Sequence, residues 1–390
     1  MTLFACGSNG NGQLGVGHED DISFFAPCLF THPLPSHTPP QFVTGGGNHA
    51  ALVTSSGELW LSGLNSDGQS SASSSEDEGW TSFRPSTIPG STRVKTVCCG
   101  WTTTFVITEQ DGLVYAMGKG SSGELGLGQV VKSSKPALIE ALRDVVDIRC
   151  GLRHVVALTR DGSLWGWGSE RHGALSNSKE TYTNKSNAKK STRWRPEPVQ
   201  IDARAVAIAC GLYFTAILDD QGRVWTMGLN KHGQLGRADP KDLISTSKPM
   251  IVSLPTKVVQ LSCGWNHTVV LCEDGGVYAW GRNDHGQLGI RGPNEIGTSA
   301  DGWYSEPMSI AYLPQQISLT NISRIACGSE HTLAVTSDKK LLTWGWNEHG
   351  NCATRDRCNV LEPRLIDGVE NVAGVGAGCG TSWVWTQGAR

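Results

Sequence analysis

Short runs that alternate apolar and polar residues recur along the chain, and turn signals separate them. The stretch HTVVLCEDGGVYAWG (267–281) is two apolar runs broken at Asp274-Gly275, which is typical of a β-hairpin. The glycines of NDHGQLG (283–289) permit tight turns, and the Pro-containing segment 247–264 predicts an edge strand and a return. We therefore expect about four short strands in this unit.

This unit is one of several copies of the same pattern. Relatives of CGWNHT (263–268) occur at 45–50, 99–104, 150–155, 210–215, 327–332 and, in degenerate form, at 377–382. The first glycine of a GxNxxGQLG-like motif falls at 7, 63, 118, 168, 228, 281 and 345, a mean spacing of about 56 residues. Seven copies of about four strands predict an all-β fold, a single seven-bladed β-propeller of four antiparallel strands per blade over residues 1–390.

The two ends of the chain complete one another. The end, SWVWTQG, supplies a strand and its turn, and the beginning, TLFACG, supplies the strand that follows that turn in the other copies. One blade is therefore expected to combine both termini, which closes the ring without free sheet edges. Tryptophans alternate with small residues in the same strand of the repeats and are expected to form core between blades: Trp60, Trp165, Trp167, Trp225, Trp280 and Trp344.

Composition narrows the functional classes. The 390 residues carry a net charge of −3 and 18% charged side chains, so no overall attraction to nucleic acid or membrane follows. The twelve cysteines include no CxxC pair, and the first residues lack a secretory signal; we expect reduced, mostly buried thiols in a cytoplasmic and nuclear protein. No apolar run reaches a membrane span, and no GxSxG, phosphate-loop or HExxH motif occurs. A non-enzyme without metal or cofactor is expected.

The hexapeptide CGWNHT has a fixed part and a variable part. Histidine holds the fifth position in four copies, and threonine or phenylalanine holds it in three; placement around a wide ring would separate such imidazoles, so we expect packing and hydrogen bonding inside each blade. These residues are His49, His154, His267 and His331, with Thr103, Phe214 and Thr381.

The two residues before this position vary freely. We expect them to point outward from one face and to bind a protein, because aromatic residues and Arg favour interface hot spots; the alternative is that they tuck under neighbouring loops. The residues concerned are Trp101, Leu152, Arg153, Leu212, Tyr213, Trp265 and Asn266.

Three loop inserts interrupt the period, near 66–90, 177–198 and 291–316, and the simplest interpretation of each is a mobile surface loop. The second is basic and aromatic, and it could contact tRNA phosphates or an acidic partner. The third contains two adjacent aromatic residues, and an acidic turn near the N-terminus could pair with a basic partner or be simply exposed. The possible secondary contacts are Glu19, Asp20, Lys189, Lys190, Arg193, Trp194, Trp303 and Tyr304.

Together, the ACGxxHT, DGxVYxWG and GxNxxGQLG motifs and their period resemble the regulator of chromosome condensation repeat family, which implies a seven-bladed propeller. The start, LFACGSNGNGQLGVGHEDD, is similar to the fungal alpha-tubulin suppressor, or killer-toxin-insensitivity, propellers. That resemblance implies a heterodimer with a small zinc-binding protein of diphthamide biosynthesis. The pair would support Elongator-dependent modification of wobble uridine in tRNA and the diphthamide modification of elongation factor two.

Two alternatives come from the same family. The first is a guanine-nucleotide exchange factor for a small GTPase, which needs a wedge that displaces Mg²⁺ and phosphate contacts; no sequence feature identifies one. The second is light sensing, because a plant ultraviolet-receptor propeller repeats GWRHT; here no Arg follows Trp101 or Trp265. Chromatin-bound members carry a basic tail before the propeller, and the first repeat here starts at residue 2, so direct chromatin binding is not expected.

Overall fold

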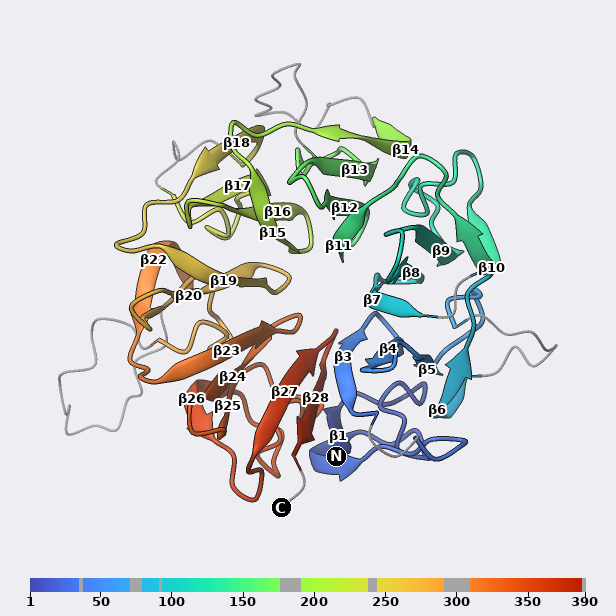
Figure 1. Cartoon of the computed structure of the whole chain (residues 1–390). Helices are drawn as coiled ribbons and strands as arrows, with labels where there is room; N and C mark the ends of the chain where they lie inside the picture. Colours follow the sequence, from blue (N-terminus) through green and yellow to red (C-terminus); the bar gives the residue numbers. More distant parts are fainter. Residues whose placement is uncertain are drawn as a thin grey trace, which may run out of the picture.

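In the computed structural model, seven four-stranded sheets surround a central channel (Figure 1). The structure describes residues 1–34, 38–70, 79–90, 93–175, 191–237, 244–290 and 309–387, and the strands and sheets below are those of these residues. Every strand pairing within the sheets is antiparallel, as the hairpin signals predicted. The expected all-β, seven-bladed propeller is therefore confirmed. No helix among the described residues has the length and hydrophobicity to cross a membrane.

The blades follow one another along the chain, and each begins at the channel. Blade 1 contains β3 (Pro40–Gly45), β4 (His49–Thr54), β5 (Leu59–Gly63) and β6 (Trp80–Ser86). Blade 2 contains β7 (Val94–Cys99), β8 (Thr103–Thr108), β9 (Val114–Lys119) and β10 (Lys132–Leu138). Blade 3 contains β11 (Val145–Cys150), β12 (His154–Thr159), β13 (Leu164–Ser169) and β14 (Thr192–Val199).

The second half of the ring repeats this order. Blade 4 contains β15 (Ala205–Cys210), β16 (Phe214–Asp219), β17 (Val224–Leu229) and β18 (Ser245–Ile251). Blade 5 contains β19 (Val258–Cys263), β20 (His267–Cys272), β21 (Val277–Arg282) and β22 (Ile310–Ile317). Blade 6 contains β23 (Ile322–Cys327), β24 (His331–Thr336), β25 (Leu341–Gly345) and β26 (Val360–Leu365). Blade 7 contains β27 (Val372–Ala377), β28 (Thr381–Thr386), β1 (Thr2–Gly7) and β2 (Ile22–Pro27).

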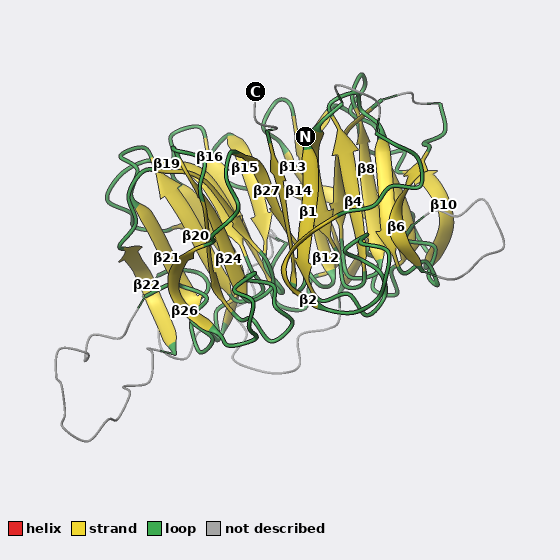
Figure 2. Cartoon of the chain, turned by 90° about the horizontal axis from the view of Figure 1, so that it is seen from below, coloured by secondary structure: helices red, strands yellow, loops and turns green. Residues whose placement is uncertain are grey.

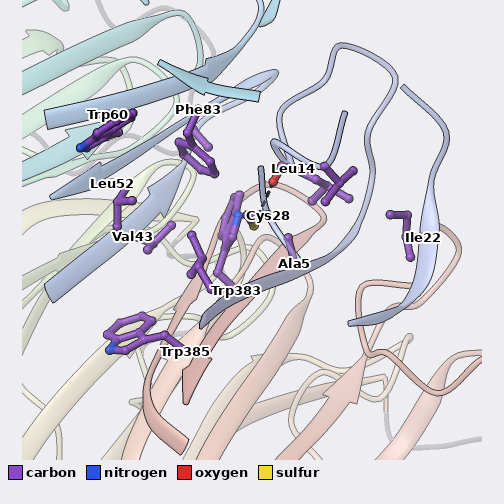
Figure 3. Close-up of a cluster of buried hydrophobic side chains, with 13 residues drawn as sticks. Ala5, Leu14, Ile22, Cys28, Val43, Leu52, Trp60, Phe83, Trp383 and Trp385 are labelled. Carbon is purple, nitrogen blue, oxygen red and sulfur yellow. Dashed lines mark hydrogen bonds between the residues drawn. The ribbon is translucent and has the colours of Figure 1, made fainter. Parts of the chain in front are cut away.

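Blade 7 closes the ring through the two ends of the chain, as expected. Its strand order is β2-β1-β28-β27, and β1 pairs with β28 in the register Thr2↔Thr386 and Leu3↔Trp385. Leu3 and Trp385 are buried in a cluster that reaches into blade 1, where it includes Trp60 and Phe83 (Figure 3). Pairing of the termini is thus backed by a shared hydrophobic core.

Tryptophans of the third strands fill the seams between blades. Trp167, Trp280 and Trp344 are fully buried, which confirms the expected core role for them. Each indole Nε1 donates to a main-chain oxygen in the preceding blade; that of Trp280 donates to Gln234 at 3.0 Å. Gly236 permits this approach, because it has a φ of +68° and a Cβ there would lie 2.5 Å from Nε1 of Trp280.

The up-and-down order of the strands defines two faces of the disc (Figure 2). One face carries the connections between first and second strands, such as 264–266, and between third and fourth strands, such as 283–290; we call it the motif face. The opposite face carries the hairpin turns, such as 273–276, and the links between blades. The variable residues of the hexapeptides therefore all lie on the motif face.

Candidate functional site

The histidine of the hexapeptide bonds to the next blade. Nε2 of His49 lies 2.8 Å from Oγ1 of Thr104, and Nε2 of His267 lies 3.2 Å from Oγ1 of Thr332. The corresponding pairs in the other blades are His154 with Thr215 at 3.1 Å and His331 with Ser382 at 3.0 Å. The prediction of hydrogen bonding inside each blade was therefore wrong, because the second strand faces the adjacent blade and finds its hydroxyl partner there.

The surroundings of these histidines fix which atom donates each hydrogen bond and whether the imidazole is charged. The Thr332 hydroxyl donates its hydrogen to the main-chain oxygen of Gln287 at 3.1 Å, so it accepts from Nε2 of His267. Burial lowers the pKa of His49, His154 and His331 to about 4, and that of His267 to about 3. The imidazoles are therefore neutral near pH 7 and act as joints between blades.

Steric contact with the histidine explains why the second position of the motif is glycine. A Cβ at Gly264 would lie 2.1 Å from Cε1 of His267, and one at Gly328 would lie 2.0 Å from Cε1 of His331. The imidazole thus packs directly on the glycine Cα, and any side chain there would displace it. This contact explains why CG and His keep a fixed spacing.

The first of the two variable residues faces the channel. Its main chain bonds to the neighbouring blade: the Leu152 nitrogen donates to Leu212 at 3.0 Å, Leu212 to Trp265 at 2.8 Å, and Trp265 to Ser329 at 2.7 Å. The side chains of Trp101, Leu152, Leu212 and Trp265 line a central cavity of about 340 Å³. The backbone ladder fixes the loops, so the side chains can vary without loosening the ring.

Trp101 and Trp265 meet at this end of the channel. Their ring centroids lie 6.0 Å apart with an interplanar angle of 48°, although they belong to blades 2 and 5. Trp101 is 40% exposed, whereas Trp265 is half-buried. The structure therefore brings together the two tryptophans singled out from the sequence and places an accessible indole near the centre of the motif face.

The second variable residue joins neighbouring blades. Arg153 is half-buried and its Nη1 lies 2.9 Å from Oε1 of Glu124, and the rings of Tyr213 and His172 lie 4.5 Å apart. Asn266 is 7% exposed and lies within hydrogen-bond distance of Gln234. An outward orientation was expected for both variable positions. At Asn266 it was wrong, because the amide is buried against the loop of the preceding blade.

A buried polar cluster between blades 5 and 6 was missed by sequence reasoning. Glu330 accepts from Nε2 of Gln287 at 2.7 Å and from Nδ2 of Asn266 at 3.2 Å, and Nη1 of Arg282 lies 3.4 Å away. Burial raises the pKa of Glu330, which these donors and Arg282 oppose. The signal available in the sequence was an acid at a variable position of the hexapeptide, following Ser329.

The possible secondary contacts have mixed outcomes. Glu19 and Asp20 are exposed, while Asp21 lies 2.6 Å from Nδ1 of His349. Arg193 is 6% exposed and lies 2.7 Å from Glu170, so its expected contact with phosphates or an acidic partner is not available on this surface. Trp194 is half-buried in β14. Four further residues lie outside the described ranges: Lys189, Lys190, Trp303 and Tyr304.

The three expected inserts are not loop throughout. Strands β6, β14 and β22 occupy parts of the ranges 66–90, 177–198 and 291–316. Each is the outermost strand of its blade. Residues 71–78, 177–190 and 291–308 of these inserts lie outside the described ranges.

Two chemical features of the described residues remain, possible metal ligands and the cysteine thiols. Within those ranges, no three His, Cys, Asp or Glu side chains are grouped closely enough to hold a metal ion. The twelve cysteines are all free; six are buried, five are partly buried and Cys358 is exposed, so the expectation of mostly buried thiols is met in part. The motif face carries the exposed indole of Trp101 and the ion pair of Arg153 with Glu124.

Comparison with known proteins assigns the family. The profile of the RCC1-like domain matches residues 2–384. The secretion-regulating guanine nucleotide exchange factor of Bos taurus is 34% identical over 97% of this chain and 81% of that protein. An RCC1 repeat-containing protein of Schizosaccharomyces pombe is 28% identical over 98% of each chain. The crystal structure of Prp20p from Saccharomyces cerevisiae has a TM-score of 0.82 at 20% identity, covers 98% of this chain and 90% of its own, and supports the fold. This chain belongs to the family of RCC1-like domain proteins.

Proposed function

We propose that this propeller is a guanine-nucleotide exchange factor for a small GTPase. The observation that carries the proposal is the 34% identity to the bovine secretion-regulating exchange factor along 97% of this chain. A mouse protein of the same description is 35% identical over 97% of the chain. These similarities favour the exchange role over the expected part in tRNA and elongation-factor modification.

The motif face offers an aromatic anchor that supports binding of a protein partner such as a GTPase. Exchange involves no covalent bond to the propeller; the GTPase must be held in a form that binds nucleotide weakly. Large aromatic side chains at the centre of a surface are frequent anchors of protein interfaces. Trp101 meets this description, with Trp265 packed beside it, and Arg153 pairs with Glu124 on the same face.

Nucleotide release provides the test. Small GTPases loaded with a fluorescent GDP analogue are mixed with the purified chain, and release is followed in excess unlabelled GTP. Wild type is expected to accelerate release from one GTPase, and Trp101→Ala to lower that acceleration more than about tenfold. Tyr312→Ala is the matched control, because Tyr312 is 53% exposed on β22, the outermost strand of blade 5. Absence of acceleration across the panel would overturn the proposal.

The heterodimer with a small zinc-binding protein of the diphthamide pathway stays a prediction supported by the resemblance of the first residues. Affinity capture followed by mass spectrometry separates the two partners. Recovery of a GTPase that Trp101→Ala no longer retains would support the exchange role. Recovery of a zinc protein of roughly ten kilodaltons, with no GTPase, would support the resemblance instead.

A further inference from the structure

Two thiols of adjacent blades meet at the wall of the channel. Cys98 lies near the end of β7 in blade 2, and Cys150 ends β11 in blade 3. Their Sγ atoms are 3.3 Å apart, and both residues line the central cavity together with Arg149. Cys98 is almost fully buried, whereas Cys150 is partly exposed. Small solutes in the channel therefore have a route to this pair.

Two other thiols that line the channel have oxygen partners. Sγ of Cys210 lies 3.6 Å from the main-chain oxygen of Arg149, and Sγ of Cys263 lies 3.6 Å from Oγ1 of Thr268. Hydrogen bonding to oxygen anchors these thiols away from one another. The contact between Cys98 and Cys150 is instead sulfur to sulfur. A disulfide would require the two Sγ atoms to approach from 3.3 Å to about 2.05 Å.

The charge distribution favours one thiol as the nucleophile. The hydrogen bond with the Cys150 thiol lowers the pKa of Cys98, against the effect of burial, and the Arg149 guanidinium acts in the same direction. Burial and the neighbouring Cys98 raise the pKa of Cys150. Because the thiolate is the reactive form, we take Cys98 as the attacking group and Cys150 as the resolving one.

We propose that Cys98 and Cys150 are a redox site, which mild peroxide converts to a disulfide between blades 2 and 3. The Cys98 thiolate attacks one oxygen of hydrogen peroxide, giving a sulfenic acid and hydroxide, which takes up a proton to form water. The Cys150 thiol then attacks that sulfur, forms the S–S bond and releases a second water. Two thiols are oxidised, one peroxide is reduced to two waters, and a dithiol reductant reverses the reaction.

Such a bond would act on the motif face. Trp101 lies three residues after Cys98, in the loop that begins where β7 ends. A covalent link from β7 to β11 would hold this loop against blade 3. Oxidation would therefore stiffen the surface that presents the exposed indole. An effect of this stiffening on partner binding rests on the proposed function. Formation of the disulfide is independent of the proposed function.

Peptide mapping of the full chain tests the proposal. The reduced protein is treated with a small excess of hydrogen peroxide, its remaining thiols are alkylated, and tryptic peptides are analysed without reduction. Cleavage after basic residues gives two diagnostic peptides, 96–119 and 150–153. Their covalent pair is expected to form, free thiols to fall from 12 to about 10, and dithiothreitol to reverse both changes.

Variants identify which sulfur is linked. Peptide 96–119 also contains Cys99, so Cys99→Ser is the matched control and is expected to keep the cross-link. Cys98→Ser is expected to abolish the cross-link. Circular dichroism checks that this variant folds. If it does not fold, the peptide map of the wild-type protein alone tests the proposal. Complete alkylation of both thiols after peroxide, or a link through Cys99 or Cys358 instead, would overturn the proposal.

Discussion

The indoles of Trp101 and Trp265 lie 6.0 Å apart across the end of the channel, although they belong to blades 2 and 5. The hexapeptide places a residue at this position in every blade, but an aromatic side chain is large enough to reach across the ring. This pair is the main reason to expect the interaction surface on the motif face.

Removal of the exposed indole is expected to leave the fold nearly as stable as before. Trp101→Ala should lower the free energy of unfolding by less than about 1 kcal/mol, because the side chain is 40% exposed. Trp280→Ala should lower it by more than about 3 kcal/mol, since that indole is fully buried and bonded to Gln234. Urea titrations of both variants measure this difference. Equal losses would mean that Trp101 is structural.

The histidine joints are expected to carry measurable stability. His267→Ala should cost about 2–3 kcal/mol, because it leaves a cavity on Gly264 and a hydroxyl of Thr332 without its donor. His267→Phe should cost less than His267→Ala, since Phe214 occupies the same position over Gly211 in blade 4. His18→Ala is the exposed control. Denaturant midpoints rank the three variants. A His267→Ala variant as stable as wild type would contradict a stabilising role of the histidine between blades.

Mild acid is expected to weaken the ring through the same imidazoles. Their pKa values of about 3 to 4 in the folded chain lie below the value of about 6.5 in an unfolded one, so the unfolded state binds more protons between these limits. The stabilisation is complete above pH 6.5 and is lost as the pH falls toward 4, by about 2 kcal/mol per imidazole at pH 5. Urea unfolding at pH 7.5, 6.0 and 5.0 measures it. His267→Phe should flatten the dependence; an unchanged slope would assign it to other groups.

Closure of blade 7 is expected to depend on the first strand. Leu3→Ala should cost about 2–4 kcal/mol, because Leu3 is 2% exposed and pairs opposite Trp385. Met1→Ala, at a residue that is 54% exposed, should change stability by less than about 0.5 kcal/mol. Thermal unfolding of both variants checks the contrast. A Leu3→Ala variant as stable as wild type would mean that the termini do not hold the ring.

The sequence by itself determined the number of blades, the order of strands and the closure by both termini. These features are local or repeated: alternation at period two predicts strands, glycines and Asp-Gly pairs predict turns, and a spacing of about 56 residues counts the blades. The truncated repeat at each end then requires β1 to pair with β28.

Only the tertiary structure decided which residues meet between blades. The bond from His267 to Thr332 and the contact of Cys98 with Cys150 each join residues of two neighbouring blades. The repeat period indicates which positions of different blades are equivalent. The contacts of those positions depend on the curvature of the ring and on the size of each side chain. The same physical reason separates the two variable residues, because the first faces the channel and the second the preceding blade.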